Sequence, residues 1–167
     1  GKTVAFNAAG YIYTQKLPDG KASRLTSGKE FEFEPSFSPD GKTIVYVTWS
    51  DTAKGAIYSI PATGGKAIKL SKEKGIYRCP VYSPDASKIA YFKESGNYDQ
   101  GMAYCVNPGI YWMDANGNAS HFVTDEGEYP AFDKTGNRIY YLTGDKLFGS
   151  LDKSYNSVDL DGFDKKV

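Results

Sequence analysis

The side chains that could act together in catalysis lie around the single histidine of the sequence. His121 follows Ser120 and precedes Asp125, and serine, histidine and aspartate together can activate a hydroxyl group for nucleophilic attack. Adjacent residues of a strand, however, point to opposite faces, and the sequence has no G-x-S-x-G turn to present a serine. We therefore predict no catalytic residue and interpret His121 as a surface or half-buried side chain.

Residues 114–125, which read DANGNASHFVTD, have oxygen-bearing side chains spaced roughly as in a calcium-binding loop. An EF-hand loop needs glycine at its sixth position and glutamate at its twelfth, where this segment has Ala119 and Asp125. The sequence DLDG at 159–162 is no closer to a calcium-binding loop. The sequence GGK at 64–66 opens no helix, as a phosphate-binding loop would. We predict no metal ion and no other cofactor.

The charge and hydropathy of the chain argue against two classes of partner. Lys and Arg together number 20 of the 167 residues, as do Asp and Glu, so the formal net charge is +0. Binding to nucleic acid relies on a basic excess, and crossing a bilayer takes about 20 consecutive apolar residues; the sequence has neither. We predict no nucleic-acid partner and no membrane insertion.

Two cysteines, Cys79 and Cys105, lie outside any C-x-x-C arrangement. In an oxidising compartment they can form one disulfide. Otherwise they are two free, mostly buried thiols, and the sequence leaves both states open.

The elements that must position all these side chains follow an internal repeat. Three prolines, Pro35, Pro80 and Pro130, mark its register. Nine and eleven residues after each proline come an isoleucine and a tyrosine: Ile44 and Tyr46, Ile89 and Tyr91, Ile139 and Tyr141. The units are residues 1–34, 35–79, 80–129 and 130–167, and the first lacks the opening strand of the others.

Each unit has the pattern of four short strands. In the second unit a short strand at the proline is followed by segments 43–49, 56–61 and 66–70, and segment 43–49 is apolar on both faces. Both faces must therefore be covered by neighbouring sheets, as in a β-propeller blade, whose unit recurs every ~40–50 residues. We predict a single all-β domain of about four four-stranded blades, either a segment of a larger propeller or a closed ring of four.

Four pairs of turn residues mark the outer hairpins of these units. Such pairs are typical of two-residue hairpin loops, in which both central residues have positive φ. The pairs are Asp19-Gly20, Gly64-Gly65, Asn116-Gly117 and Asp161-Gly162.

The motif SPDGK at 38–42, with GGK at 64–66, resembles the TolB-type propeller repeat, a WD-repeat-like blade, over nearly the whole chain. Ala86 replaces the turn glycine of this motif, and DKTGN at 133–137 replaces the full motif, which predicts weaker turns at both places. Residues 46–71, together with segments 137–144 and 157–162, are also similar to the propeller that precedes the amidohydrolase domain of certain bacterial hydrolases. The resemblance implies a periplasmic or secreted location. It also implies that any such hydrolase centre lies outside this chain, because one histidine cannot supply its metal ligands.

Two groups of residues are candidates for binding. Residues 93–109 form an insertion in the third unit, and loops on a rigid scaffold often bind partners; its aromatic and sulfur-containing residues, with the tryptophan that follows, are Tyr98, Met102, Tyr104 and Trp112. Polar residues beside the predicted inner strands form a second group at the channel mouth: Glu32, Glu34, Arg78 and Glu128. The alternatives are a loop packed on its own blade and ordinary solvation of the channel.

These observations favour a non-catalytic TolB-like module that binds a protein partner or an adjoining domain of the same polypeptide. The alternative is that the chain is the propeller part of a larger metal-dependent amidohydrolase. The first reading predicts Tyr98, Tyr104 and the channel mouth as the contact surface, whereas the second predicts metal-binding histidines elsewhere in the polypeptide.

Overall fold

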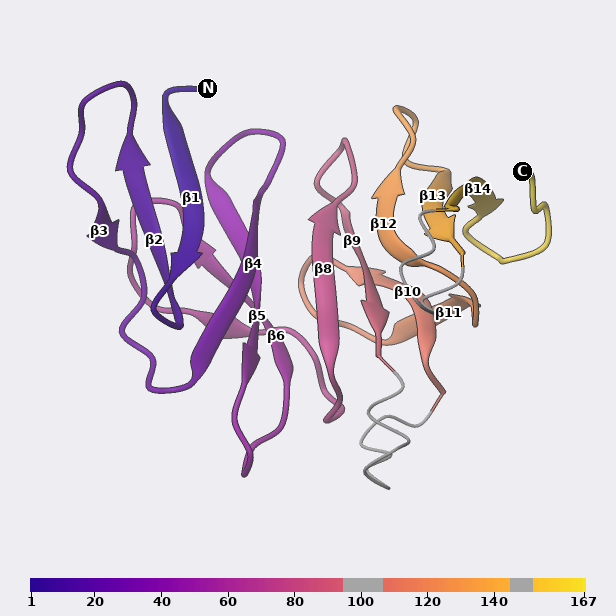
Figure 1. Ribbon diagram of the computed structural model, residues 1–167, viewed down its shortest axis with the longest axis horizontal. Helices are drawn as coiled ribbons and strands as arrows, with labels where there is room; N and C mark the ends of the chain where they lie inside the picture. The colour runs from indigo at the N-terminus through magenta and orange to yellow at the C-terminus, as the bar shows by residue number, and fades with distance from the viewer. Residues whose placement is uncertain (95–106, 145–151) are drawn as a thin grey trace.

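The structure is a computed structural model that describes residues 1–94, 107–144 and 152–167. The described residues form antiparallel sheets and no helix, so none of them belongs to a helix that could span a bilayer. Four sheets stand side by side along the long axis in chain order, with the first and the fourth at opposite ends (Figure 1). The sheets thus form an open row of blades, not a closed ring, and the predicted all-β propeller fold is confirmed.

The strands are distributed over the four sheets in chain order. The first sheet contains β1 (Thr3–Ala8), β2 (Tyr11–Lys16) and β3 (Ser23–Arg24). The second contains β4 (Phe31–Phe37), β5 (Thr43–Trp49), β6 (Ala56–Pro61) and β7 (Ile68–Lys69). The third contains β8 (Tyr77–Tyr82), β9 (Lys88–Lys93), β10 (Gly109–Asp114) and β11 (Ser120–Thr124). The fourth contains β12 (Glu128–Phe132), β13 (Arg138–Thr143) and β14 (Ser154–Asp159).

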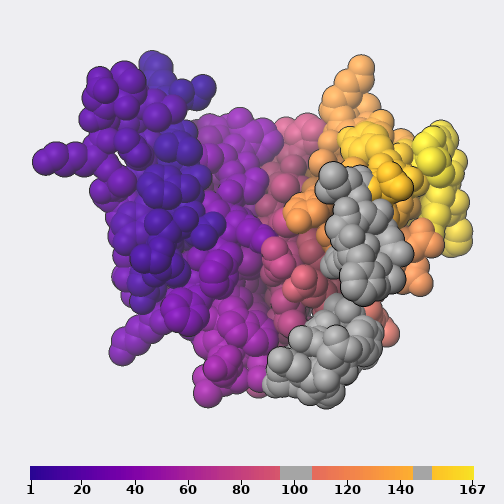
Figure 2. Space-filling view, viewed as in Figure 1, coloured from indigo at the N-terminus to yellow at the C-terminus, as the bar shows by residue number. Residues whose placement is uncertain are grey.

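Contacts between sheets show which strands correspond. The second strand of one blade packs against the first strand of the next, as β5 does with β8 and β9 with β12. β1 makes the same contact with β4, so the three strands of the first sheet match the last three strands of a complete blade. Figure 2 shows the same succession of blades across the surface.

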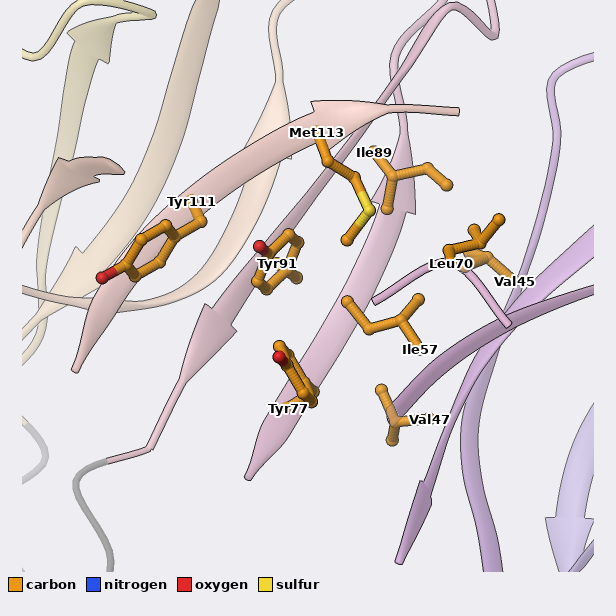
Figure 3. Packing of buried hydrophobic residues seen from close by; sticks show 9 residues of the cluster. All are labelled: Val45, Val47, Ile57, Leu70, Tyr77, Ile89, Tyr91, Tyr111 and Met113. Atoms are coloured by element: carbon orange, nitrogen blue, oxygen red, sulfur yellow. The ribbon is translucent and has the colours of Figure 1, made fainter. Parts of the chain in front are cut away.

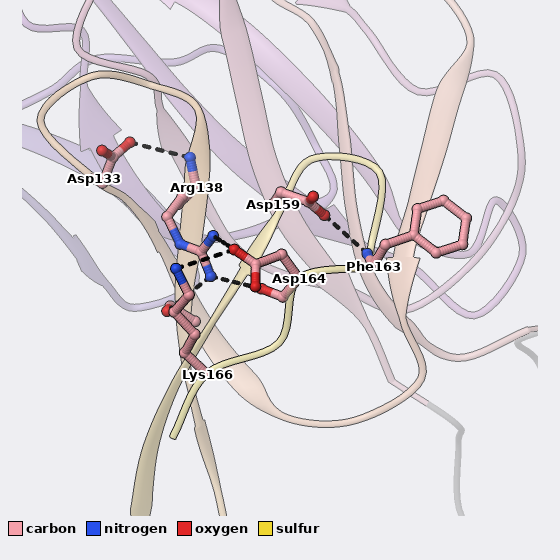
Figure 4. A network of polar contacts seen from close by, with 7 residues as sticks. Asp133, Arg138, Asp159, Phe163, Asp164 and Lys166 are labelled. Carbon is pink, nitrogen blue, oxygen red and sulfur yellow. Dashed lines mark hydrogen bonds and ion pairs between the residues drawn. The ribbon is translucent and has the colours of Figure 1, made fainter.

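The fourth sheet has a substitute for its outermost strand. Lys166 forms an isolated antiparallel bridge with Ser157, at the place where Ile68 of β7 pairs with Ser59 in the second sheet. Arg138 and Lys166 both contact the carboxylate of Asp164, at 2.7 and 3.1 Å (Figure 4). The C-terminal segment is thereby held against β14.

The hydrophobic core consists of layers between neighbouring sheets. Between the second and third sheets, Val45 and Val47 of β5 lie opposite Ile89 and Tyr91 of β9, and all four side chains are buried (Figure 3). Each large apolar side chain so buried contributes about 1.5–3 kcal/mol to the free energy of unfolding. Burial on both faces of the second strand is the property that its two-sided apolar sequence predicted.

The anchor prolines lie within the first strand of their sheets. Pro35 is in β4, Pro80 in β8 and Pro130 in β12, so each of these sheets also takes residues that precede its anchor. A β-bulge interrupts the pairing of each of these strands with the next strand at this point.

The predicted positive φ at both residues of each pair is found at Gly64-Gly65, with φ of 86° and 124°, but the prediction is wrong at Asp19-Gly20, Asn116-Gly117 and Asp161-Gly162. The N–H of Gly117 donates to the carbonyl of Asp114, and that of Gly162 donates to Asp159, so glycine ends a four-residue turn. Gly117 has a φ of 86° and Gly162 of 84°, while the preceding Asn116 and Asp161 do not have positive φ. A turn of this kind needs left-handed backbone only at its last residue.

A candidate binding site at one rim

One rim of the row of blades brings together two of the charged residues that the sequence suggested, Glu34 and Arg78. It is the rim at which β4, β8 and β12 begin and β5 and β9 end, at the lower edge of Figure 1 for the two central blades. We call it the Arg78 rim, after the arginine in the second position of β8.

Arg78 links two blades at this rim. Its Nε donates to Glu34 Oε1 at 2.7 Å, and its second terminal nitrogen lies 2.7 Å from the same oxygen. Its remaining terminal nitrogen donates to Glu94 Oε1 at 3.1 Å. Arg78, Glu34 and Glu94 are each about one-quarter to one-third exposed, at 37%, 25% and 33%. The hydrogen bond with Glu34 raises the pKa of Arg78 further above its ordinary value, so the guanidinium stays charged at any physiological pH.

The backbone beside Arg78 has an uncommon conformation that recurs in three blades. The residue before each anchor proline has positive φ: Glu34 at 52°, Cys79 at 49° and Tyr129 at 54°. Residues other than glycine rarely adopt this backbone conformation, which costs about 1–3 kcal/mol when the surrounding structure imposes it. At Cys79 the conformation lets the backbone N–H donate to Glu34 Oε2 at 2.6 Å. The bulge at Cys79 thus links β8 to β4 of the preceding blade.

A cavity of about 410 Å³ opens beside this ion-pair network. Its lining includes Asn7 of the first sheet, Phe33, Glu34 and Trp49 of the second, and Arg78 and Glu94 of the third. We call it the Arg78 cavity. It offers one cationic group between two carboxylates, next to a half-buried indole ring.

Cys79 does not contribute a nucleophile to this site. Burial, and next the negative charge of Glu34, raise the pKa of its thiol to about 12. The group is therefore protonated at neutral pH, and the thiol form is the unreactive one. Cys79 forms no disulfide with any described residue, and Cys105, its predicted alternative partner, lies outside the described residues.

The other two predicted channel residues lie apart from Arg78. Glu32 is 2% exposed, and its Oε2 accepts the backbone N–H of Ile12 at 3.0 Å and the hydroxyl of Thr26. Glu128 borders a cavity of about 390 Å³ between the third and fourth sheets. The structure therefore brings Glu34 and Arg78 together and places Glu32 and Glu128 at two other blade interfaces.

Trp112 packs within the fold. Its ring stacks on that of His121 with centroids 4.0 Å apart, and its Nε1 donates to the carbonyl of Leu160 at 3.2 Å. It also packs against the core layer between the third and fourth sheets. The three other residues predicted for the rim loop, Tyr98, Met102 and Tyr104, lie outside the described residues.

Sequence reasoning did not single out three residues of this rim, although Lys93 and Glu94 lie within the insertion at 93–109 that it named. Trp49 and Glu94 belong to the Arg78 cavity, and their position at or just after the end of a second strand is a signal that the repeat contains. Lys93 is 6% exposed, pairs with Glu73 at 3.2 Å and lies 4.9 Å from the centroid of the Tyr111 ring. It borders a larger cavity of about 970 Å³ on the same rim. An alternating strand pattern gives no sign that a lysine will be buried.

Within residues 1–94, 107–144 and 152–167, no group of three or more His, Cys, Asp or Glu side chains could hold a metal ion.

The blades, their order and their bulged inner strands define a partial β-propeller whose fold is similar to that of TolB. The chain is similar to TolB from Acinetobacter baumannii, with 23% identity and a TM-score of 0.69 over 98% of this chain and 40% of that one. It is also similar to an oligogalacturonate lyase in complex with manganese, with 14% identity and a TM-score of 0.70 over 99% of this chain and 49% of that one. A hydrazine synthase from Kuenenia stuttgartiensis matches at 14% identity and a TM-score of 0.69, over 93% of this chain and 27% of that one.

These likenesses concern the fold, and the chain spans less than half the length of each of these three structures. No family model matches the sequence, and no curated protein matches it.

Proposed function

We propose that this chain is a non-catalytic TolB-like propeller module that binds a protein partner, or an adjoining domain of the same polypeptide, through the Arg78 rim. The observation that carries the proposal is the Arg78 cavity. There a charged arginine, held by two carboxylates, lies beside Trp49 at a partly exposed site.

The chemistry of this site suits a protein surface. Arginine and tryptophan are enriched among the residues that contribute most to protein–protein binding, because they combine large contact area with directed hydrogen bonds. Glu34 and the strained bulges hold the guanidinium in place before a partner arrives, which reduces the entropy lost on binding. The two carboxylates leave the mouth acidic around a central cation, which favours a partner that presents basic and hydrogen-bonding groups.

Fold alone does not choose the function. The three similar structures are a TolB, a lyase and a synthase, so one architecture occurs with unrelated activities. The proposal therefore rests on the site and not on these names.

Site-specific photo-cross-linking tests the proposal. Trp49 is replaced by p-benzoylphenylalanine, and the labelled chain is irradiated in an extract of the organism that encodes it. We expect a discrete cross-linked protein that is lost in a second version also carrying Arg78→Gln. The matched control places the same photo-reactive residue at Phe163, which is 88% exposed and lies in the C-terminal segment beyond the fourth sheet.

Two outcomes would contradict this use of the rim. One is the same set of cross-linked proteins from both labelled positions, which would indicate nonspecific contact. The other is a Trp49 product that survives Arg78→Gln but is lost with Arg24→Gln, an arginine of the first sheet outside the Arg78 cavity.

The second candidate function is the propeller part of a larger metal-dependent amidohydrolase. This chain spans only 49% of the lyase and 27% of the synthase. That observation favours a larger parent protein. The test is to express the complete reading frame and assay amide hydrolysis with and without a chelator. Chelator-sensitive hydrolysis that persists in Arg78→Gln would support this candidate, whereas a reading frame without clustered histidines would exclude it.

A further inference from the structure

A second polar cavity lies between the first two blades and has a different chemistry. It measures about 420 Å³ and is bordered by the 26–30 segment, by side chains of β4, β5 and β6, and by the β6–β7 turn. We call it the Glu32 cavity. It adjoins the Arg78 cavity at Thr48, which borders both, but none of the charged groups of that site lines it.

The carboxylate of Glu32 is only partly used by the protein. Both described hydrogen bonds, from Ile12 and Thr26, go to Oε2. Oε1 points toward Gly28, where a methyl group in place of the glycine hydrogen would lie 2.9 Å from it. No described residue donates a hydrogen bond to Oε1, although the side chain is 2% exposed. A carboxylate oxygen that borders a cavity in this way can accept a hydrogen bond from a ligand or water.

Thr48 has an unused hydroxyl on the same face of the sheet. Thr48 is 6% exposed, and within the described parts of the chain its Oγ1 has no hydrogen-bond partner. It lies directly across from Glu32 in the pairing of β4 with β5, and residues paired in this way have Cβ atoms about 4.5–5.5 Å apart. The two unused oxygens therefore belong to one polar spot.

Two tyrosines complete the deep wall of the cavity. Tyr46, 3% exposed, precedes Thr48 by two residues on the same face of β5, and its ring stacks on that of Tyr58 at 5.9 Å. Neither tyrosine hydroxyl has a hydrogen-bond partner among the residues that the structure describes. Burial, and next the charge of Glu32, raise the pKa of Tyr46.

The charged groups of this cavity are arranged by depth. Glu32 is buried, Glu30 is half-buried, and Lys29 and Lys66 are exposed at the mouth. Exposed charges are screened by water and salt, whereas the charge of a buried carboxylate is not. The field at the deep end is therefore negative, and the free groups there are oxygen atoms that can accept hydrogen bonds.

We propose that the Glu32 cavity binds a primary ammonium group carried on a short carbon chain. Its three N–H donors match the three free oxygens of Glu32, Thr48 and Tyr46, and the rings of Tyr46 and Tyr58 attract a cation and cover the carbon chain. A bare metal ion would leave most of the 420 Å³ unfilled and would not use the apolar walls, which include Ile60 and Ala67. This site is independent of the protein-binding role proposed for the Arg78 rim.

Binding of n-butylammonium chloride to the purified chain tests the proposal, followed by chemical-shift changes in NMR spectra. We expect saturable shifts centred on Thr48 and Tyr58, and no such shifts with n-butanol or with sodium chloride at the same ionic strength. Nα-acetyl-lysine amide forms a second arm. Stronger binding of this probe than of n-butylammonium would identify a lysine side chain as the source of the ammonium, and weaker binding would identify a small free amine.

Three variants decide the role of the named groups. Thr48→Val removes the free hydroxyl at constant shape, and we expect it to weaken n-butylammonium binding by about tenfold without loss of folding. Glu32→Gln, which keeps an acceptor for Ile12, should weaken binding at least as much. Thr14→Val in β2, which does not line this cavity, is the matched control and should bind as the unmodified chain does.

The proposal is overturned if n-butanol and n-butylammonium give equal shifts, if sodium chloride reproduces them, or if no probe binds saturably. Unchanged affinity in Thr48→Val would overturn it as well. Because Thr48→Val removes no hydrogen bond from the fold, its result stands even if Glu32→Gln is destabilised.

Discussion

The second and third blades are built on one repeat, but each meets the preceding blade with a different chemistry. Three residues before the anchor proline the second blade has Glu32, and the third has Tyr77. Glu32 brings a carboxylate into the first interface, where it accepts hydrogen bonds from Ile12 and Thr26. Tyr77 instead brings a ring into the next interface and meets Tyr91 edge-on at 5.5 Å.

The same backbone group is satisfied in two ways at these interfaces. The N–H of Ile12 in β2 donates to the carboxylate of Glu32 at 3.0 Å, whereas the N–H of Ile57, its counterpart in β6, donates to the hydroxyl of Ser71 at 3.0 Å. The repeat thus determines which positions are buried and which backbone groups need a partner. Individual side chains determine whether the interface is filled with rings or keeps a polar cavity.

The largest expected effect comes from deleting the tyrosine eleven residues after the anchor in each blade. Tyr91→Ala should lower the free energy of unfolding by about 3–5 kcal/mol, because the side chain is fully buried and the hydroxyl bonds Ser120 at 2.6 Å. Tyr46→Ala should cost about 1–2 kcal/mol less, because its hydroxyl bonds no described residue and the lost volume joins an existing cavity. Urea unfolding followed by tyrosine and tryptophan fluorescence measures both. Equal losses would show that the two interfaces are packed alike.

A smaller loss in the free energy of unfolding is expected from removing the polar partner of each buried N–H group. Glu32→Ala leaves the N–H of Ile12 and the hydroxyl of Thr26 without an acceptor and should cost about 2–3 kcal/mol. Ser71→Ala, its counterpart, leaves one N–H group unpaired and should cost about 1–2 kcal/mol. The measurement is again urea unfolding, with Glu32→Gln as the variant that should restore most of the loss. A larger loss from Ser71→Ala than from Glu32→Ala would contradict the roles assigned here.

The sequence was sufficient for the blades but not for the chemistry of their interfaces. Isoleucine and tyrosine in fixed register after each anchor predicted buried second strands, and Ile44, Ile89 and Ile139 are all fully buried. A strand pattern records the face of a side chain but not what meets it from the next blade. This is why the sequence grouped Glu34 and Arg78 with Glu32, whereas the pairing of the first two, the burial of Glu32 and the packing of Trp112 could not be foreseen.

The turn that follows the inner strand should contribute a smaller difference in the free energy of unfolding between the two blades. Gly41 and Ala86 end equivalent turns with φ of 70° and 59°, a conformation that suits glycine and strains alanine. Ala86→Gly should therefore raise the free energy of unfolding by about 0.5–1 kcal/mol, and Gly41→Ala should lower it by about as much. A methyl group at Gly41 would meet no atom within 4 Å, so this pair of variants isolates the backbone effect. Thermal unfolding checks it, and a destabilised Ala86→Gly would show that the alanine methyl makes a useful contact.

The smallest effect concerns the aspartates of these turns and appears only in acid. Asp85 accepts hydrogen bonds from the Ser83 hydroxyl, at 2.6 Å, and from the Ser87 N–H, at 3.0 Å; these bonds hold its pKa well below the ordinary 3.8. A carboxyl group whose pKa is lower in the folded state stabilises the fold fully above its unfolded pKa. That contribution is lost as the pH falls through the folded pKa.

The free energy of unfolding should thus fall as the pH drops below 3.8, and Asp85→Asn should reduce the slope. Asp40→Asn in the second blade is the matched variant, because the pKa of Asp40 is lowered by the corresponding bonds to Ser38 and Lys42. Asp133 of the fourth blade, whose pKa is lowered to about 2 by its bond with Thr135, should sustain part of the slope in both variants. Urea unfolding at a series of pH values measures the slopes. If neither substitution changes the slope, the turn aspartates are not the groups that link the stability of these blades to pH.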